Sequence, residues 1–232
     1  APAQTTALEV TGPMAAGVPT DASNLVLRAA ALFDTPVQVV LSKELPSAAG
    51  LGGGSSDAAA TLMAMAEMLG QTTLPEGAVA LGADVRVCLA RTAARMRGIG
   101  DEVELVDWLP PIFAVLANPG IEVPTPEVFK ALAVKDNPPM QKRIPRWRGA
   151  RSAIDWIGAQ RNDLQEPAIG MFPVIGTVIE ALAALPGARL ARMSGSGATC
   201  FALFEDRAEA EAAADALGAA QPGWWVRAAE LH

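Results

Sequence analysis

The chain has 232 residues, of which 51% are hydrophobic and 19% are charged, so it is long enough to bury a core in one large or two modest globular domains. Its formal net charge of -7 disfavours nucleic-acid binding through a broad basic surface. No apolar run approaches the ~20 residues that span a bilayer, and the first residues lack a signal-peptide pattern, so no membrane partner is expected.

The first predicted elements are a short strand, a loop and a helix. The apolar run 8–10 predicts a strand, and because it begins so soon after Ala1, we expect further chain before it. Residues 13–19 form a loop rich in turn formers. Residues 21–24 then offer capping side chains ahead of a helix predicted over 25–33.

A glycine-rich segment joins the next strand to the next helix. Residues 37–41 are typical of a strand, and residues 58–69 repeat apolar side chains at helical spacing. Between them, four glycines fall within residues 50–54, followed by two serines. Glycines let backbone amides turn inward, and the first amides of a helix have no partner within it, so the segment predicts an anion site, most often for phosphate.

A glycine-rich segment can also be a Walker loop, a dinucleotide-binding loop or a flexible linker. It is not the Walker loop, because no Gly-Lys-Ser/Thr closes it, and its glycine spacing does not fit the dinucleotide fingerprint. Composition alone favours a flexible linker. The apolar strand before it and the amphipathic helix after it argue against a linker.

The rest of the first half contains an aspartate typical of a turn, one strand with a predicted range, and a turn between further strands. Residues 78–81 form an apolar segment that ends at Gly82, and a strand is predicted over 85–90. Asp84 precedes that strand and is by itself typical of a turn. A turn at 98–102 joins further strands, and the pair Pro110-Pro111 marks the expected domain boundary because it breaks both element types.

Helices and strands alternate in the second half. Strands are predicted over 112–116, 190–193, 199–204 and 224–227, and helices over 124–129, 152–160, 174–185 and 208–217. Residues 161–164 are interpreted as a helix cap. Two of the strands are joined by Ser194-Gly195-Ser196-Gly197-Ala198, which by default is a hairpin turn.

Two further features concern charge and redox state. A basic cluster lies in the irregular segment 136–151, and a solvated loop is favoured over a binding patch; its members are Lys142, Arg143, Arg146, Arg148 and Arg151. Cys88 and Cys200 are far apart, and each lies in an apolar, strand-like run. Free buried thiols and a reducing, cytoplasmic setting are therefore expected.

Three motifs resemble those of the GHMP small-molecule kinases. They are Pro46 through Ala60, Gly82-Ala83-Asp84-Val85, and Met193 through Thr199. The resemblance extends from about Leu8 to about Glu230. The triple-glycine form Ala-Gly-Leu-Gly-Gly-Gly-Ser-Ser-Asp-Ala-Ala resembles one branch, which phosphorylates the 2-hydroxyl of a sugar alcohol linked to cytidine diphosphate, in the non-mevalonate route of isoprenoid biosynthesis.

The resemblance implies an α+β fold of two halves with the active site between them. Residues 1–110 would form the N-terminal, ATP-binding domain with an unusual left-handed β-α-β crossover, and residues 111–232 a ferredoxin-like C-terminal domain. ATP would be the phosphoryl donor, with Mg²⁺, and the acceptor a small cytidine diphosphate compound. A monomer or homodimer, with no nucleic acid or membrane as partner, is expected.

The resemblance also assigns roles to residues, and metal ligands are left unassigned. Asp84 would be the catalytic base. The residues that would bind the nucleotide are Asn24, Lys43, Pro46, Gly50, Gly52, Gly53, Gly54, Ser55 and Ser56, and those near the acceptor are Thr125, Phe129, Gly195 and Gly197. By themselves, Asn24 and Thr125 would be helix caps, Phe129 a core contact and Lys43 an exposed lysine at a strand end.

The sequence departs from the family pattern in places. The family begins with a strand that carries a catalytic lysine, followed by a Gly-Tyr-His element, whereas this chain has no tyrosine and its one histidine is His232. Arg86 also replaces a proline. Either the chain lacks a piece of a working enzyme, which we favour, or it is a degenerate paralogue that binds nucleotide without transferring phosphate. A kinase for another alcohol, such as homoserine or mevalonate, is the third alternative.

Overall fold

In the computed structural model, which describes residues 4–231, the chain divides into two units. Unit 1 comprises residues 4–47 and 52–106, and unit 2 comprises residues 48–51 and 107–231. The last change of unit thus falls between Val106 and Asp107, shortly before Pro110-Pro111. The short loop segment 48–51 belongs to unit 2, which is otherwise formed by the later part of the sequence. Within the described residues, no helix has both the length and the hydropathy needed to cross a bilayer.

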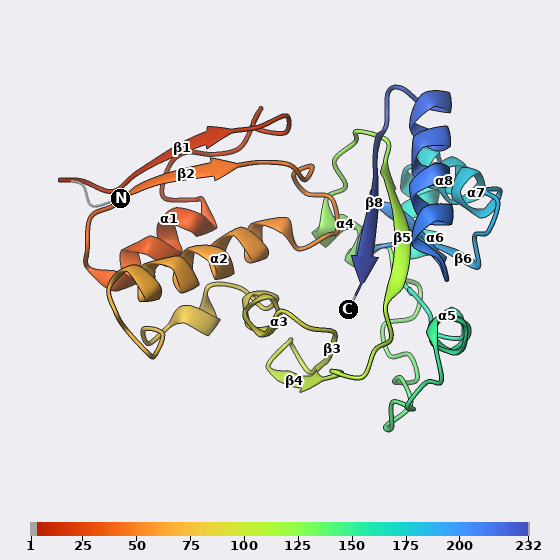
Figure 1. Cartoon of the computed structure of the whole chain (residues 1–232), viewed down its shortest axis with the longest axis horizontal. Coiled ribbons are helices and arrows are strands. Elements are labelled where there is room, and N and C mark those ends of the chain that lie inside the picture. The colour runs from red at the N-terminus through yellow and green to blue at the C-terminus, as the bar shows by residue number, and fades with distance from the viewer. Residues whose placement is uncertain (1–3, 232) are drawn as a thin grey trace. The chain divides into compact units, whose positions relative to one another are not determined.

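Unit 1 is built on a β-α-β arrangement followed by a long helix and a hairpin. Its elements are β1 (Ala7–Thr11), α1 (Leu25–Ala30), the 3₁₀ turn η1 (Ala31–Phe33), β2 (Gln38–Ser42), α2 (Gly53–Met68), the 3₁₀ turn η2 (Ala78–Ala80), α3 (Val85–Ala90), β3 (Ala94–Arg97) and β4 (Glu102–Leu105). Strands β1 and β2 pair in parallel, with Ala7 opposite Gln38. Figure 1 shows α1 and α2 lying along one side of this pair.

Small side chains let the two helices of unit 1 pack closely. Ala29 and Ala30 of α1 and Ala58 and Ala59 of α2 are buried in one cluster, which Leu62 also joins. Alanine adds little bulk between helix backbones and favours the helix itself. This cluster fixes α2, and with it the position of the glycine segment at its first turn.

The prediction of a strand over residues 85–90 is wrong, because these residues form the helix α3. Val85 is fully buried against the core of unit 1, and Cys88 and Leu89 pack against the same core. Positions 85, 88 and 89 share one face of a helix but alternate between the two faces of a strand. Packing against α2 therefore overrides the strand preference of the valines.

The predicted helices, the other two strands and the turn at 98–102 are confirmed in unit 1. Both predicted strands of the parallel pair are present, and the helix predicted over 25–33 ends in the 3₁₀ turn η1. The turn at 98–102 joins β3 and β4, which pair in antiparallel fashion. The helix predicted to follow the glycine segment runs to Met68, beside Gly70.

Unit 2 has a four-stranded antiparallel sheet with the order β6-β7-β5-β8. Its elements are β5 (Ile112–Asn118), α4 (Thr125–Lys130), α5 (Ala150–Gly158), α6 (Gln165–Met171), α7 (Val174–Ala183), β6 (Leu190–Met193), β7 (Cys200–Phe204), α8 (Arg207–Ala220) and β8 (Trp225–Leu231). Two split β-α-β units interleave in this order, as expected for the ferredoxin-like arrangement. Of these elements, only α6 was not predicted.

The central strand β5 is buried on both faces, which fixes the layers of unit 2. Val115 and Ala117 belong to the cluster that contains α7 and α8, whereas Ile112 and Ala114 belong to the cluster that contains Ile154 of α5. Figure 1 shows α8 lying along the sheet. The sheet is therefore covered by helices on both faces, and β5 is apolar up to its last residue, Asn118.

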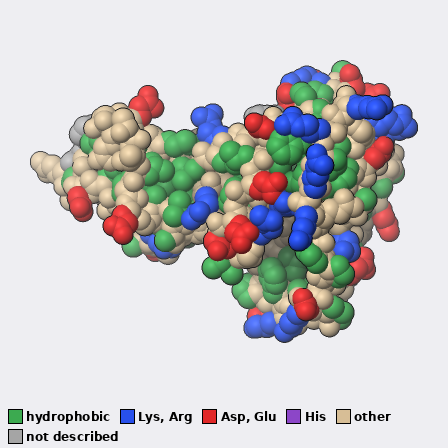
Figure 2. Space-filling model, turned by 90° about the horizontal axis from the view of Figure 1, so that it is seen from below, with side chains coloured by type: hydrophobic (Ala, Val, Ile, Leu, Met, Phe, Trp, Pro, Cys, Tyr) green, Lys and Arg blue, Asp and Glu red, His purple; other side chains and the backbone are tan. Residues whose placement is uncertain are grey.

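The basic cluster agrees with the sequence-based expectation, whereas the prediction of two buried thiols in strands holds only for Cys200, because Cys88 is half-buried and lies in α3. All five basic side chains are exposed, and Arg146 lies over the ring of Trp108, 4.9 Å from its centroid. Figure 2 shows acidic and basic side chains interspersed on the displayed face of unit 2. Cys88 and Cys200 are both free, with Cys200 buried and Cys88 half-buried.

Candidate functional site

The glycine segment turns through left-handed backbone and ends as the first turn of α2. Gly50 and Gly52 have φ values of +71° and +65°, which side chains other than glycine rarely adopt. Ser56 donates the first helical hydrogen bond, from its amide to Gly52 O at 2.9 Å. The amides of Gly53, Gly54 and Ser55 precede this bond and so have no partner within the helix. They form the positive end of a 16-residue helix, which favours a bound anion.

Asp84 lies beside this helix start. A Cβ placed on Gly52 would lie 3.9 Å from Asp84 Oδ2, and one placed on Gly82 would lie 3.8 Å from Ser55 Oγ. The segment from Gly82 to Asp84 thus runs against the beginning of α2, within unit 1. Asp84 is exposed and forms the N-terminal boundary of α3. Its carboxylate therefore lies beside the glycine segment and is accessible to solvent.

The predicted exposed lysine at the strand end is instead buried. Lys43 is 6% exposed, and its Nζ donates a hydrogen bond of 2.5 Å to Asp57 Oδ2 in the first turns of α2. A Cβ on Gly53 would lie 3.4 Å from Lys43 Nζ, so the ammonium group also lies close to the first residue of the helix. An ion pair therefore stands at the same helix start as the unpaired amides.

The first part of the glycine segment is held by unit 2. Ser194 Oγ donates to Gly50 O at 2.8 Å, and the Thr199 amide donates to Ala49 O at 3.2 Å. A Cβ on Gly50 would lie 2.4 Å from Ser194 O, closer than real contacts allow. The segment 194–199 is therefore more than a hairpin turn, because it receives the backbone of residues 48–51 against its own.

Polar side chains brace segment 194–199 from two sides. Thr125 Oγ1 and Ser196 Oγ share a hydrogen bond of 2.7 Å. Asn162 Nδ2 donates to the carbonyl oxygens of Met193 and Gly195 at 3.0 and 2.9 Å, while its Oδ1 accepts from the Leu164 amide. The prediction that 161–164 caps a helix is therefore incomplete, since Asn162 also fixes the second glycine segment.

Five further predicted site residues are divided between the two units: Asn24, Pro46 and Ser56 lie in unit 1, and Thr125 and Phe129 lie in unit 2. Asn24 caps α1: its Oδ1 accepts from the Val26 amide at 2.9 Å, and its Nδ2 donates to Pro19 O at 2.7 Å. Pro46 is half-buried and Ser56 is exposed, both within unit 1. In unit 2, Thr125 is the first residue of α4 and is not its cap, which is Pro124. Phe129 is 52% exposed, so it is not a core contact.

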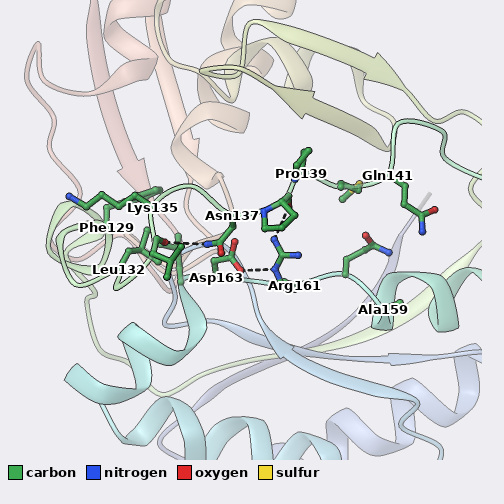
Figure 3. Close-up of a pocket in the computed structure, with 14 residues that line it drawn as sticks. Phe129, Leu132, Lys135, Asn137, Pro139, Gln141, Ala159, Arg161 and Asp163 are labelled. Carbon is green, nitrogen blue, oxygen red and sulfur yellow. Dashed lines mark hydrogen bonds and ion pairs between the residues drawn. The ribbon is translucent and has the colours of Figure 1, made fainter.

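A pocket of about 600 Å³ opens beside Phe129 in unit 2. Figure 3 shows it between the irregular segment after α4, which contributes Lys135 and Pro139, and the chain that follows α5. Arg161 Nε donates to Asp163 Oδ1 at 2.9 Å, and Arg161 Nη2 donates to Pro138 O at 2.8 Å, so this arginine ties the two walls together. The pocket thus combines an accessible aromatic ring with cationic side chains.

Two carboxylates near the start of α2 influence the pKa of a neighbouring thiol. Burial raises the pKa of the Cys88 thiol, and the charges of Asp84 and Asp57 raise it further, so both carboxylates act on the same thiol of α3. Among residues 4–231, no group of three or more His, Cys, Asp or Glu side chains is arranged to hold a metal ion.

Sequence reasoning missed two contributors. Asp57 lies within the glycine motif, and the resemblance implies no role for it, although an aspartate one turn into a helix that follows a lysine-bearing strand end is a signal for an ion pair. No local pattern points to the contact between Gly50 and Ser194, because 144 residues separate them.

Comparison with protein families matches two parts of the chain. Residues 24–101 match the model described as GHMP kinases N terminal domain, and residues 141–223 match GHMP kinases C terminal. The two matches together cover more than half of the chain, and the first includes the whole of the glycine segment and Asp84.

Individual proteins give closer matches. A protein from Cereibacter sphaeroides named 4-diphosphocytidyl-2-C-methyl-D-erythritol kinase is 53% identical over 234 residues, which cover 99% of this chain and 84% of the relative. One of the same name from Dinoroseobacter shibae is 52% identical over 220 residues, or 94% of this chain and 76% of the relative.

Solved structures agree on the fold. A crystal structure of 4-(cytidine 5'-diphospho)-2C-methyl-D-erythritol kinase superposes with a TM-score of 0.74 at 34% identity, covering 99% of this chain and 82% of the other. A homoserine kinase from Cytophaga hutchinsonii gives a TM-score of 0.64 at 18% identity, covering 100% and 84%, which is a likeness of fold alone.

Proposed function

The chain belongs to the GHMP kinase family, and on that basis we propose that it phosphorylates the 2-hydroxyl of 4-diphosphocytidyl-2-C-methyl-D-erythritol with ATP, in isoprenoid precursor biosynthesis. One observation carries the proposal: a relative of that name is 53% identical across 99% of this chain. The enzyme is thus a phosphotransferase with an alcohol group as acceptor. We further propose residues 1–110 and 111–232 as its two domains.

The glycine segment and Asp84 would share the chemistry. Phosphoryl transfer depends on positioning and on stabilising charge, with little covalent work for the protein. The amides at the start of α2 would bind the β- and γ-phosphates of ATP. The acceptor oxygen forms a bond to the γ-phosphorus as the bond to the β,γ-bridging oxygen breaks and ADP leaves. Asp84 takes the proton of the acceptor hydroxyl.

Mg²⁺ would be held mainly by the nucleotide. Magnesium sites in kinases use one or two protein oxygens together with phosphates and water. Ser55 Oγ lies close to the Gly82–Asp84 segment, so its hydroxyl and that of Ser56 fit a role as the protein's oxygen ligands beside phosphate. When bound, the ion would neutralise phosphate charge.

On the acceptor side, the pocket beside Phe129 supports a place for the cytosine ring. The phenyl ring of Phe129 is accessible, and aromatic rings stack on nucleobases. Thr125, one turn earlier on α4, and the glycines at 195 and 197 would contact the rest of the acceptor. The cytoplasm and a monomeric or homodimeric state remain our expectations.

Release of ADP tests the proposal directly. Purified protein is incubated with Mg-ATP and either the cytidine diphosphate acceptor or homoserine, and ADP is measured by a coupled assay. We expect release only with the cytidine diphosphate acceptor, and competitive inhibition by CMP against that acceptor. Binding of ATP without acceptor-dependent release of ADP would instead favour the nucleotide-binding paralogue, and release with homoserine would favour another kinase of the family.

A further inference from the structure

We propose that Asp57 is a positioning residue, which holds the ammonium group of Lys43 at the start of α2 so that it meets the phosphates of the bound nucleotide. The proposal rests on the proposed function, since it assumes that this helix start receives ATP. It assigns to Asp57 a role that acts through Lys43 and requires no contact of its own with phosphate or acceptor. It also explains why a lysine is buried where a helix is most positive.

The location of Lys43 is unfavourable unless an anion is present. Its side chain lies against Gly53, the first residue of α2, where the helix dipole is positive, and only 6% of the residue is exposed. A buried ammonium group without a partner is strongly destabilising. Asp57 supplies the missing negative charge at 2.5 Å.

The two partners come from different elements, so their contact fixes a geometry. Lys43 follows β2, whose last residue is Ser42, and the Lys43 amide donates to Thr11 O at 2.7 Å. Asp57 lies in α2, fourteen residues later. Because both backbones are anchored, the ion pair limits the lysine to rotamers in which its ammonium group points at the helix start.

The ion pair is largely shielded from solvent, so an anion that reaches the ammonium group interacts with it strongly. The side chain of Asp57 is 23% exposed and that of Lys43 is 7% exposed. An ammonium group has three donors, and Asp57 Oδ2 occupies one of them. A phosphate oxygen at the neighbouring amides would take another, so Lys43 would bridge the aspartate and the nucleotide. A purely structural pair would not need to lie at the glycine segment.

The experiment measures nucleotide affinity in a double-mutant cycle. The variants are Lys43→Met, Asp57→Asn and their combination, and affinity for a non-hydrolysable ATP analogue with Mg²⁺ is measured by isothermal titration calorimetry. We expect Asp57→Asn to raise the Kd about tenfold in the wild-type background, and to change it less than about twofold in the Lys43→Met background. KM for the acceptor should stay within about twofold, since only nucleotide binding is affected.

An ion pair in the hairpin of unit 1 provides the control. Arg95, whose side chain is 7% exposed, pairs with Glu104, whose side chain is 39% exposed, across β3 and β4, so Glu104→Gln removes a carboxylate charge from an ion pair that involves no residue of α2. Glu104→Gln should leave the Kd for the analogue unchanged. The pair Lys43→Met with Asp57→Leu, which substitutes apolar groups of similar size, should unfold near the wild-type temperature yet bind nucleotide as weakly as Lys43→Met.

Several outcomes would overturn the proposal. Equal effects of Asp57→Asn with and without Lys43 would show that the aspartate does not act through the lysine. Wild-type affinity in the apolar double variant would show a structural pair only. Failure of the wild type to bind nucleotide would overturn this proposal and the proposed function together, whereas binding without acceptor-dependent ADP release contradicts the proposed function alone.

Discussion

In the proposed reaction, the carboxylate of Asp84 accepts the proton of the acceptor hydroxyl. Its Oδ2 lies beside Gly52, at the entrance of the helix whose amides would bind phosphate. The carboxylate is exposed, so an acceptor hydroxyl can reach it from solvent. A base in that place needs no covalent step, only the correct distance to the acceptor oxygen.

Replacing Asp84 by asparagine should separate chemistry from binding. The amide keeps the shape of the side chain but cannot accept the proton, so we expect kcat to fall by roughly 10²–10⁴-fold while nucleotide affinity is kept. Steady-state ADP release and calorimetry measure the two quantities. Asp155→Asn, an exposed aspartate in α5, is the control and should change neither. A fall in kcat below tenfold would remove Asp84 from the role of base.

The buried thiol Cys200 makes stability depend on alkaline pH. Burial raises its pKa from 9.0 to about 12, because the charged thiolate is poorly solvated in the core of unit 2. The folded state keeps this proton while the unfolded state loses it, so the free energy of unfolding falls as pH rises from 9 toward 12. The slope is about 1.4 kcal/mol per pH unit.

Urea unfolding at pH 8, 9, 10 and 10.5 tests this for the wild type and for Cys200→Ala. The alanine variant will be less stable at pH 8 because it leaves a cavity, so slopes against pH are compared and not absolute values. We expect a shallower loss of stability above pH 9 in the variant. Parallel curves would show that Cys200 does not contribute.

At the scale of elements, the backbone of the glycine segment decides the geometry of the site. The sequence predicted this segment, its helix and the adjoining strand because glycine, serine and apolar spacing are local signals. It could not predict α3, since the alternating valines at 85 and 87 suit a strand and only contact with α2 favours the helix. It also left α6 out, as seven residues containing a proline and a glycine have little helical signal of their own.

Two glycine substitutions should have opposite effects on stability. Gly50→Ala meets Ser194 O at 2.4 Å and has a positive φ, so we expect a loss of more than about 1 kcal/mol in the free energy of unfolding. Gly170→Ala, in α6, meets nothing within 4 Å and should gain about 0.5–1 kcal/mol. Urea unfolding measures both, and a stable Gly50→Ala variant would show that the loop does not keep this contact.

At the scale of the whole molecule, the division into units does not follow the order of the chain. Residues 48–51 belong with 107–231, although the chain on both sides of them lies in unit 1. The last change of unit falls between Val106 and Asp107, whereas the boundary predicted from composition is the diproline at 110–111. The excursion at 48–51 depends on contacts over 144 residues, which no local pattern encodes.

A fragment comprising residues 107–232 should therefore fold incompletely around segment 194–199. The Thr199 amide donates to Ala49 O in the whole chain, whereas the Ser194 amide donates to Thr199 O within the fragment. We expect hydrogen exchange at Thr199 to be at least about tenfold faster in the fragment, while protection at Ser194 persists. Adding a peptide of residues 45–54 should restore protection at Thr199. Equal exchange in both forms would mean that the glycine segment is dispensable for unit 2.

The order of strands in unit 2 has a consequence for biosynthesis. Strand β5 is apolar on both sides and pairs with β7 and β8, which the ribosome makes roughly eighty and more than a hundred residues later. During translation β5 therefore waits without partners, a state in which aggregation competes with folding. Synonymous codons that slow elongation before β7 would lengthen that interval, so we expect the yield in the cell to fall with slower translation of the second half of the message.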